Sequence, residues 1–180
     1  SIALAAHQIM IAISTLGFMI YYGVGAAVSV RVSNFYGRGD ITNVKRSTMA
    51  GFHIMLCLVL IASTIFFFAQ DVIGILFTTS PEVISLVSSL IIILMIYQFG
   101  DALQIIYANS LRGIGDVISM AIISFIGYFL LAMPVCYICG FILNLGITGI
   151  WIGYPVGLTL TGIMLCGRYY WKLKNGRLFR

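Results

Sequence analysis

The sequence predicts an all-α fold, a polytopic membrane helix bundle with five transmembrane helices. Of the 180 residues, 61% are hydrophobic and only 8% are charged, whereas a soluble domain carries about 25% charged residues. The mean hydropathy is +1.09. Apolar runs of about 20 residues, the length that crosses the hydrocarbon core as an α-helix, recur along the chain. Together these observations indicate a membrane protein.

Five spans follow one another along the chain. We expect them at about residues 2–30, 50–69, 83–111, 117–141 and 147–167. Transmembrane β-strands do not fit, because they alternate polar and apolar residues over about ten positions, and LCLVLIASTIFFFA does not alternate. Pro134 and Pro155 lie inside the last two spans, where a proline removes a backbone hydrogen bond and bends the helix. These bends either serve packing alone or let the bundle rock between inward-open and outward-open shapes.

The positively charged residues are segregated along the sequence. All ten follow the first, third or fifth span: Arg31, Arg38, Lys45, Arg46, Arg112, Arg168, Lys172, Lys174, Arg177 and Arg180. Segments 70–82 and 141–149, after the second and fourth spans, contain none. Because positively charged loops stay in the cytoplasm, we expect a cytoplasmic C-terminus and a multi-pass protein of the plasma (inner) membrane. The net charge of +5 then reflects topology, and we expect no nucleic-acid partner.

The start of the chain predicts that residues are missing upstream. Ser1 stands on the first residues of a span, with no initiator Met, no basic segment and no small-residue cleavage site. These features exclude a signal peptide. An odd number of helices, with Ser1 on the outer side, favours a fragment. We expect at least one further span before Ser1 in the natural protein.

No pattern in the sequence indicates a metal centre, an organic cofactor or an enzyme. Cys136-Tyr-Ile-Cys139 has neither the second cysteine pair nor the nearby histidine of a zinc site. Aspartyl chemistry generally needs two carboxylates close together, and only Asp101 lies within the expected spans. A structural subunit of a membrane bundle remains an alternative.

Asp101 is the candidate functional residue. It precedes Arg112 by eleven residues, which is about 16 Å along a helix. If Arg112 marks the cytoplasmic interface, Asp101 lies near the midplane of the bilayer. A charged side chain that faces lipid there costs about 2.5–3.5 kcal/mol on insertion scales. We therefore expect Asp101 to face a cavity or another helix.

Polar side chains share one face of the third span with Asp101. Tyr97, Gln98 and Gln104 lie one turn away from it, and Asn109 continues the stripe. The opposite face carries Ile92, Ile96, Leu103 and Ile106. A carboxylate in this setting can take up H⁺, bind Na⁺ through its oxygen atoms or pair with a cationic substrate, and competition between these occupants couples their movements. The alternative is a hydrogen bond to Gln98 or Gln104 that only fastens helices together.

Three segments of the chain resemble one known family. ALAAHQIMIAISTLGFMIYYGVGAAVSVRVSNFYGRGD, YQFGDALQIIYANSLRGIGD and LGITGIWIGYPVG are similar to the eighth, tenth and last helices of the multidrug and toxic compound extrusion (MATE) family. That family has twelve helices in two similar lobes. The resemblance implies that residues 1–180 are the C-terminal lobe from helix eight to helix twelve, with the N-terminal lobe and helix seven missing.

The resemblance also implies a function. Members of the family are secondary active antiporters that export cationic amphipathic compounds, such as drugs and toxins, in exchange for Na⁺ or H⁺. Asp101 and Tyr97 match residues of a cation-coupling site, while Gln98, Gln104 and Gln8 are candidates to line the substrate cavity. The expected partners are the lipid bilayer, small cationic organic substrates and the N-terminal lobe. A lipid-linked sugar flippase of related fold is an alternative, although its anionic substrate would favour basic residues deep in the spans, and none is present.

Overall fold

This computed structural model describes residues 2–175, apart from the side chain of Asp71. Those residues form helices and short turns, without a strand. The long helices are α1 (Ile2–Gly37), α2 (Ile41–Phe77), α3 (Pro81–Gly113) and α6 (Gly146–Lys174). The fourth span is built from α4 (Val117–Phe125), the π-helix η1 (Ile126–Ala132), α5 (Met133–Tyr137) and the π-helix η2 (Ile138–Ile142). All five spans are long and apolar enough to cross a membrane, which confirms the predicted helix bundle.

The helices extend beyond the expected spans, and the second one differs most. The span expected at 50–69 lies within α2, which begins at Ile41 and ends at Phe77. Asp40 caps its first turn, since its side chain accepts a hydrogen bond from the Asn43 N–H at 3.0 Å. The segment 70–82, interpreted as a loop, therefore remains helical as far as Phe77. Hydropathy locates the lipid-embedded part of a helix, whereas caps determine where the helix begins and ends.

Two turns at the same end of the bundle have the same sequence pattern and the same backbone. GRGD joins α1 to α2, and GIGD joins α3 to α4. Gly39 and Gly115 have φ angles of 72° and 75°, a conformation that glycine adopts without the cost of a Cβ. The N–H groups of Asp40 and Asp116 donate to the carbonyl oxygens five residues earlier, at 3.0 and 2.9 Å. This hydrogen bond closes both helix C-termini.

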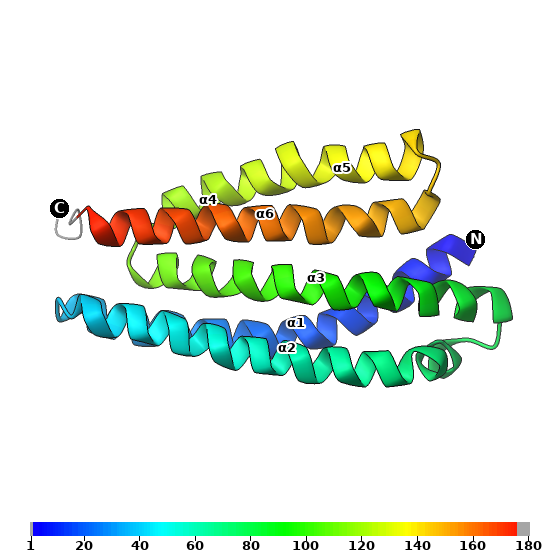
Figure 1. Ribbon diagram of the computed structural model, residues 1–180, viewed down its shortest axis with the longest axis horizontal. Helices are drawn as coiled ribbons and strands as arrows, with labels where there is room; N and C mark the ends of the chain where they lie inside the picture. The colour runs from blue at the N-terminus through cyan, green and yellow to red at the C-terminus, as the bar shows by residue number, and fades with distance from the viewer. Residues whose placement is uncertain (1, 176–180) are drawn as a thin grey trace.

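Figure 1 shows how the helices are layered. α3 lies in the middle, with α1 and α2 on one side and α6 on the other, and the fourth span runs along the far side of α6. The basic residues gather at one end of the bundle, here called the basic end: Arg31, Arg38, Lys45, Arg46, Arg112, Arg168, Lys172 and Lys174. Arg177 and Arg180 lie outside the described residues.

The apolar face expected opposite the polar stripe of α3 is exposed only in part. Ile92 and Ile96 are exposed, as an outer face should be, but Ile106 is fully buried. Near the basic end α3 packs against α1, α2 and α6 together. Residues 105–111 of α3 are all buried there, so the apolar residues opposite the polar stripe do not form one continuous outer face.

Buried hydroxyl groups connect three helices at the basic end. The Thr48 hydroxyl of α2 lies 2.8 Å from the Tyr169 hydroxyl of α6 and 3.0 Å from the Ser110 hydroxyl of α3. Tyr169 also lies 3.5 Å from the Val44 carbonyl oxygen, at the limit of hydrogen bonding. Thr48, Ser110 and Tyr169 are all fully buried. This hydroxyl cluster fixes the positions of α2, α3 and α6 relative to one another.

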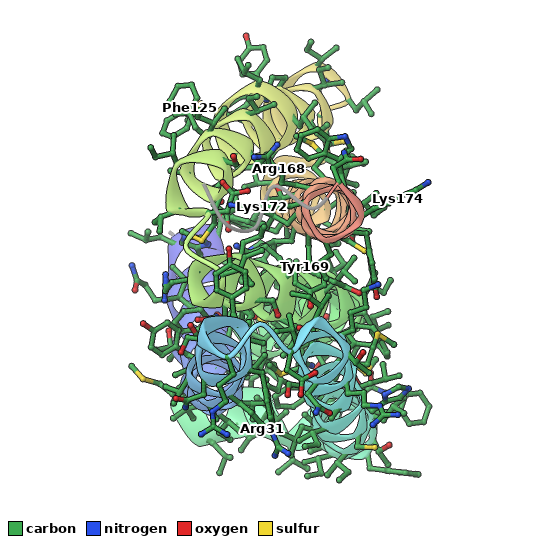
Figure 2. The ribbon with its side chains drawn as sticks, turned by 90° about the vertical axis from the view of Figure 1, so that its left-hand side faces the viewer. Arg31, Phe125, Arg168, Tyr169, Lys172 and Lys174 are labelled. Atoms are coloured by element: carbon green, nitrogen blue, oxygen red, sulfur yellow. The ribbon has the colours of Figure 1, made fainter. Side chains whose placement is uncertain are left out.

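An ion-pair cluster ties α6 to the start of the fourth span. The Arg168 Nε atom donates to a carboxylate oxygen of Asp116 at 2.8 Å, and the Lys172 ammonium lies 3.5 Å from the same oxygen. Figure 2 shows Arg168 and Lys172 on the side of α6 that faces α4, whereas Lys174 projects away from it. Burial alone would raise the pKa of Asp116, but hydrogen bonds from Arg168 and Ser119 and the charge of Lys172 lower it below its usual value.

Candidate functional site

Asp101 faces other helices rather than lipid, as the sequence predicted. Its side chain is only 3% exposed. Its Oδ2 atom makes no hydrogen bond within residues 2–175. A small cavity of about 10 Å³ lies beside it, lined by Ile13, Ser14, Gly17, Tyr21, Phe66, Leu94, Tyr97, Gln98 and Asp101. We call it the Asp101 chamber, and it lies where α1, α2 and α3 meet.

Gln98 is bound to a residue that sequence reasoning missed. The hydroxyl of Tyr21, on α1, donates a hydrogen bond to the Gln98 Oε1 atom. Both side chains are almost completely buried, and the Gln98 Nε2 atom has no partner among the described residues. The alternative in which Gln98 ties down Asp101 therefore does not match this arrangement. No local signal marks Tyr21, because 77 residues separate it from Gln98.

A larger cavity of about 490 Å³ lies between α3, the fourth span and α6. Its walls carry three tyrosine rings, and we call it the tyrosine cavity: Tyr97, Tyr128, Ala132, Met133, Cys136, Ile150, Tyr154 and Leu158. A third cavity, of about 140 Å³, is lined by Ile11, Ser14, Tyr97, Trp151 and Tyr154. Tyr97 lines all three cavities. Its side chain is thus shared between the Asp101 chamber and the tyrosine cavity.

The remaining polar candidates have different surroundings. Gln104 is partly buried and lies near the hydroxyl of Tyr128, on the fourth span. Gln8 is exposed on α1 and lines none of the three cavities. Asn109 accepts a hydrogen bond from Arg112 at 3.2 Å and belongs to the basic end. The structure therefore gathers Tyr97, Gln98, Asp101 and Gln104 along α3 but does not bring Gln8 to them.

Several buried polar atoms in this half of the bundle lack partners. Besides Asp101 and Gln98, the His7 Nδ1 and Trp151 Nε1 atoms make no hydrogen bond within the described part of the chain. The rings of His7 and Trp151 meet edge-on, with centroids 5.8 Å apart. No group of three His, Cys, Asp or Glu side chains in residues 2–175 could hold a metal ion. The chemistry available around Asp101 is that of one carboxylate, tyrosine and serine hydroxyls and amides.

A family model and several curated proteins match this chain. The family model, described as MatE, matches residues 1–138. The multidrug resistance protein NorM of Photobacterium profundum is 35% identical over 175 residues, which cover 95% of this chain and 38% of that protein. The multidrug resistance protein MdtK of Photorhabdus laumondii is 33% identical over 177 residues, covering 96% of this chain and 39% of that protein. The chain thus spans less than half the length of these relatives.

Three solved structures of MATE transporters have the same fold. The eukaryotic MATE transporter AtDTX14 matches 98% of this chain with a TM-score of 0.88 and 23% identity, over 40% of its own length. A multidrug resistance MATE family transporter in an outward-facing conformation gives a TM-score of 0.88 at 17% identity, over 95% of this chain and 38% of its own. A multidrug resistance MATE family transporter in an inward-facing conformation gives a TM-score of 0.85 at 19% identity. The match covers 98% of this chain and 43% of that transporter. The fold therefore fits both conformations about equally well.

Proposed function

Because this chain belongs to the MatE family, we propose that it forms the C-terminal lobe of an efflux transporter in the plasma (inner) membrane. The names of the relatives, multidrug resistance proteins NorM and MdtK, support this proposal. The N-terminal lobe and one further helix then belong to the rest of the protein. The gathering of basic residues at one end supports a cytoplasmic C-terminus.

The transported compounds are cationic and amphipathic, and their export is coupled to the entry of Na⁺ or H⁺. The observation that carries this proposal is the Asp101 carboxylate, which is 3% exposed and has an unpaired Oδ2 atom. A buried carboxylate without a partner is costly when charged. A proton, a Na⁺ ion or an organic cation relieves that cost. Because these occupants compete for one group, binding of one favours release of another.

Tyr97 and the tyrosine cavity supply the apolar part of the binding site. Tyr97 lies between the Asp101 chamber and the larger cavity, so a cation held by Asp101 is within reach of its ring. Gln98 and Gln104 add amide groups along the same helix. Gln8 is exposed and contributes only to a cavity that forms with the rest of the protein.

Alternating access follows from movement of this lobe against the other. Similar TM-scores to outward-facing and inward-facing transporters support movement of the lobe as a rigid body. Each cycle then exposes Asp101 first to one side of the membrane and then to the other. The ion enters from outside, and the organic cation leaves by the same site.

The test is Asp101→Asn in the complete transporter, reconstituted in liposomes and energised by a Na⁺ or a H⁺ gradient. We expect efflux to fall by about tenfold or more, the factor that corresponds to about 1.4 kcal/mol of lost binding. Asp40→Asn is the matched control, because asparagine keeps the helix cap there. Efflux by Asp101→Asn at the control rate would remove Asp101 from the mechanism. Comparison of the two gradients identifies the coupling ion.

A further inference from the structure

The fourth span is attached to the bundle mainly along α6, through small residues. Gly149, Gly153, Gly157 and Thr161 of α6 meet Cys139, Cys136, Ala132 and Gly127 of the fourth span, and we call this contact the glycine seam. A methyl group on Gly153 would lie 2.9 Å from the backbone nitrogen of Cys136. One on Gly157 would lie 3.1 Å from the Cα atom of Ala132. The two backbones are therefore in direct contact.

The two sides of the glycine seam have different spacings in the sequence. On α6 its members are four residues apart, the spacing that keeps side chains on one face of an α-helix. On the fourth span the step from Gly127 to Ala132 is five residues. In a regular α-helix five residues rotate by about 140° beyond a full turn, against about 40° for four. An α-helix could not keep both residues in the seam.

The π-helix η1 provides this longer step. It covers Ile126–Ala132, and the N–H of Met133 donates to the Tyr128 carbonyl five residues earlier. Pro134 follows directly and has no N–H to donate, so the turn before it lacks one α-helical hydrogen bond. Such π turns amount to one inserted residue and often occur at functional sites. The inserted residue here widens the turn that carries Tyr128.

Tyr128 connects the fourth span to the polar stripe of α3. Its side chain lies near Gln104, one turn beyond Asp101, and its ring lines the tyrosine cavity. Tyr97, one turn before Asp101, lines both this cavity and the Asp101 chamber, so one side chain connects the cavity that Tyr128 lines to the site of Asp101. We propose that Tyr128 completes the Asp101 site from the fourth span, and that η1 places it there without breaking the glycine seam. This inference rests on the proposed function, since the ligand of the site is the transported cation.

The first test concerns the register of the helix. Deletion of Leu130, an exposed residue of η1, shortens the five-residue step to four, so we expect an α-helical turn with the seam intact. Deletion of Val135 is the control, because it shortens a regular four-residue step between Ala132 and Cys136. The complete protein carries Cys136 as its single reactive thiol, after replacement of every other cysteine, including Cys57, Cys139 and Cys166.

Maleimide labelling of Cys136 and thermal unfolding report the outcome. The Leu130 deletion should label at the wild-type rate and unfold at the wild-type temperature or above it. The Val135 deletion should lose the cooperative transition or expose Cys136. If both deletions change Cys136 labelling and unfolding to the same extent, η1 does not contain an inserted residue, and this part of the proposal is wrong.

The second test concerns the role of Tyr128 in ligand binding. Tetraphenylphosphonium and Na⁺ serve as probes, and each should raise the unfolding temperature of the complete protein when it binds. Tyr128→Phe and the Leu130 deletion should raise the half-saturating concentration of a probe by about threefold to tenfold, as expected for one lost hydrogen-bonding group. Leu130→Ala keeps the π turn and should leave the half-saturating concentration of each probe unchanged.

Binding is measured without transport, so the two proposals fail separately. Unchanged half-saturation in Tyr128→Phe, or no stabilisation of the wild type by either probe, would overturn the assignment of Tyr128. Normal binding together with absent ion-driven efflux in the wild type would instead overturn the proposed function. Equal weakening by Leu130→Ala and by the deletion would show that the side chain, not the π turn, matters.

Discussion

At the basic end, the buried Thr48 hydroxyl hydrogen-bonds to Ser110 and Tyr169, whereas around the Asp101 chamber the Asp101 Oδ2 and Gln98 Nε2 atoms have no partner among the described residues. Both regions belong to the same bundle and use the same central helix, α3. At one end of α3 every side is packed, and further along it lies beside cavities.

This difference separates scaffold from binding site. Hydrogen-bonded polar groups add about 1 kcal/mol each and fix the relative position of helices, while an unpaired buried group costs about 1–3 kcal/mol. Asp101 and Gln98 keep unpaired buried atoms despite this cost in stability. We propose that they are kept because a transported cation binds to them and is then released. The basic end then holds the helices in fixed positions, and the ligand binds at the Asp101 chamber further along α3.

Replacement of Asp101 by an apolar residue should have the largest effect, because it should remove transport without lowering stability. Asp101→Leu should abolish ion-driven efflux, because no carboxylate remains to bind the ion or the organic cation. It should not lower the unfolding temperature of the complete protein, since it removes an unpaired polar atom. Calorimetry and a liposome efflux assay on the same preparation measure both quantities. A drop in stability would show that Asp101 has a structural partner after all.

Removal of the Tyr169 hydroxyl should have the opposite result, a loss of stability without a loss of cation binding. Tyr169→Phe should lower the free energy of unfolding by about 1–2 kcal/mol, because it breaks the contact with Thr48 and leaves that buried hydroxyl with fewer partners. Binding of a cation at the Asp101 chamber should persist. Thermal unfolding and probe binding test this prediction.

Thr48→Val provides the second arm of a double-mutant cycle with Tyr169→Phe. Because the two hydroxyls contact each other at 2.8 Å, the losses should be less than additive. Strictly additive losses would mean that the hydroxyl cluster does not act as a unit.

The sequence was sufficient for the parts of the fold that depend on composition and on local spacing. Apolar runs identified five spans because each must match the thickness of the bilayer. The i, i+3 and i+4 spacing around Asp101 placed Tyr97, Gln98 and Gln104 on its side of the helix, and Tyr97 and Gln98 line the Asp101 chamber with it. The isolated carboxylate within an apolar run was signal enough to single out Asp101.

Features that depend on contacts between distant segments could not be predicted. Tyr21 reaches Gln98 only because α1 packs on α3, and nothing near Tyr21 in the sequence specifies this. The π turn at Tyr128 becomes intelligible only when its five-residue step is compared with the four-residue steps of α6. Burial of Ile106 likewise follows from three neighbouring helices and not from the pattern of α3 itself.

The smallest effect is expected from the ion pairs at the basic end, and it depends on pH. The pKa of Asp116 is lowered in the folded protein, because hydrogen bonds and cations around it outweigh its burial. Its contribution to stability is therefore present above the unfolded pKa of about 3.9 and is lost as the pH falls through the folded pKa. Partly exposed pairs of this kind contribute about 0.2–1 kcal/mol.

Asp116→Asn should thus lower the free energy of unfolding slightly at pH 7 and flatten its decline between about pH 5 and pH 2, a window that brackets the unfolded value of about 3.9. The matched control is Asp40→Asn in the other G-x-G-D turn, where the side chain faces Asn43 rather than Arg168 and Lys172. High salt should weaken the Asp116 contribution at pH 7, because both partners carry charge. An equal response of the two variants to salt would mean that the ion pairs add nothing beyond the shared turn.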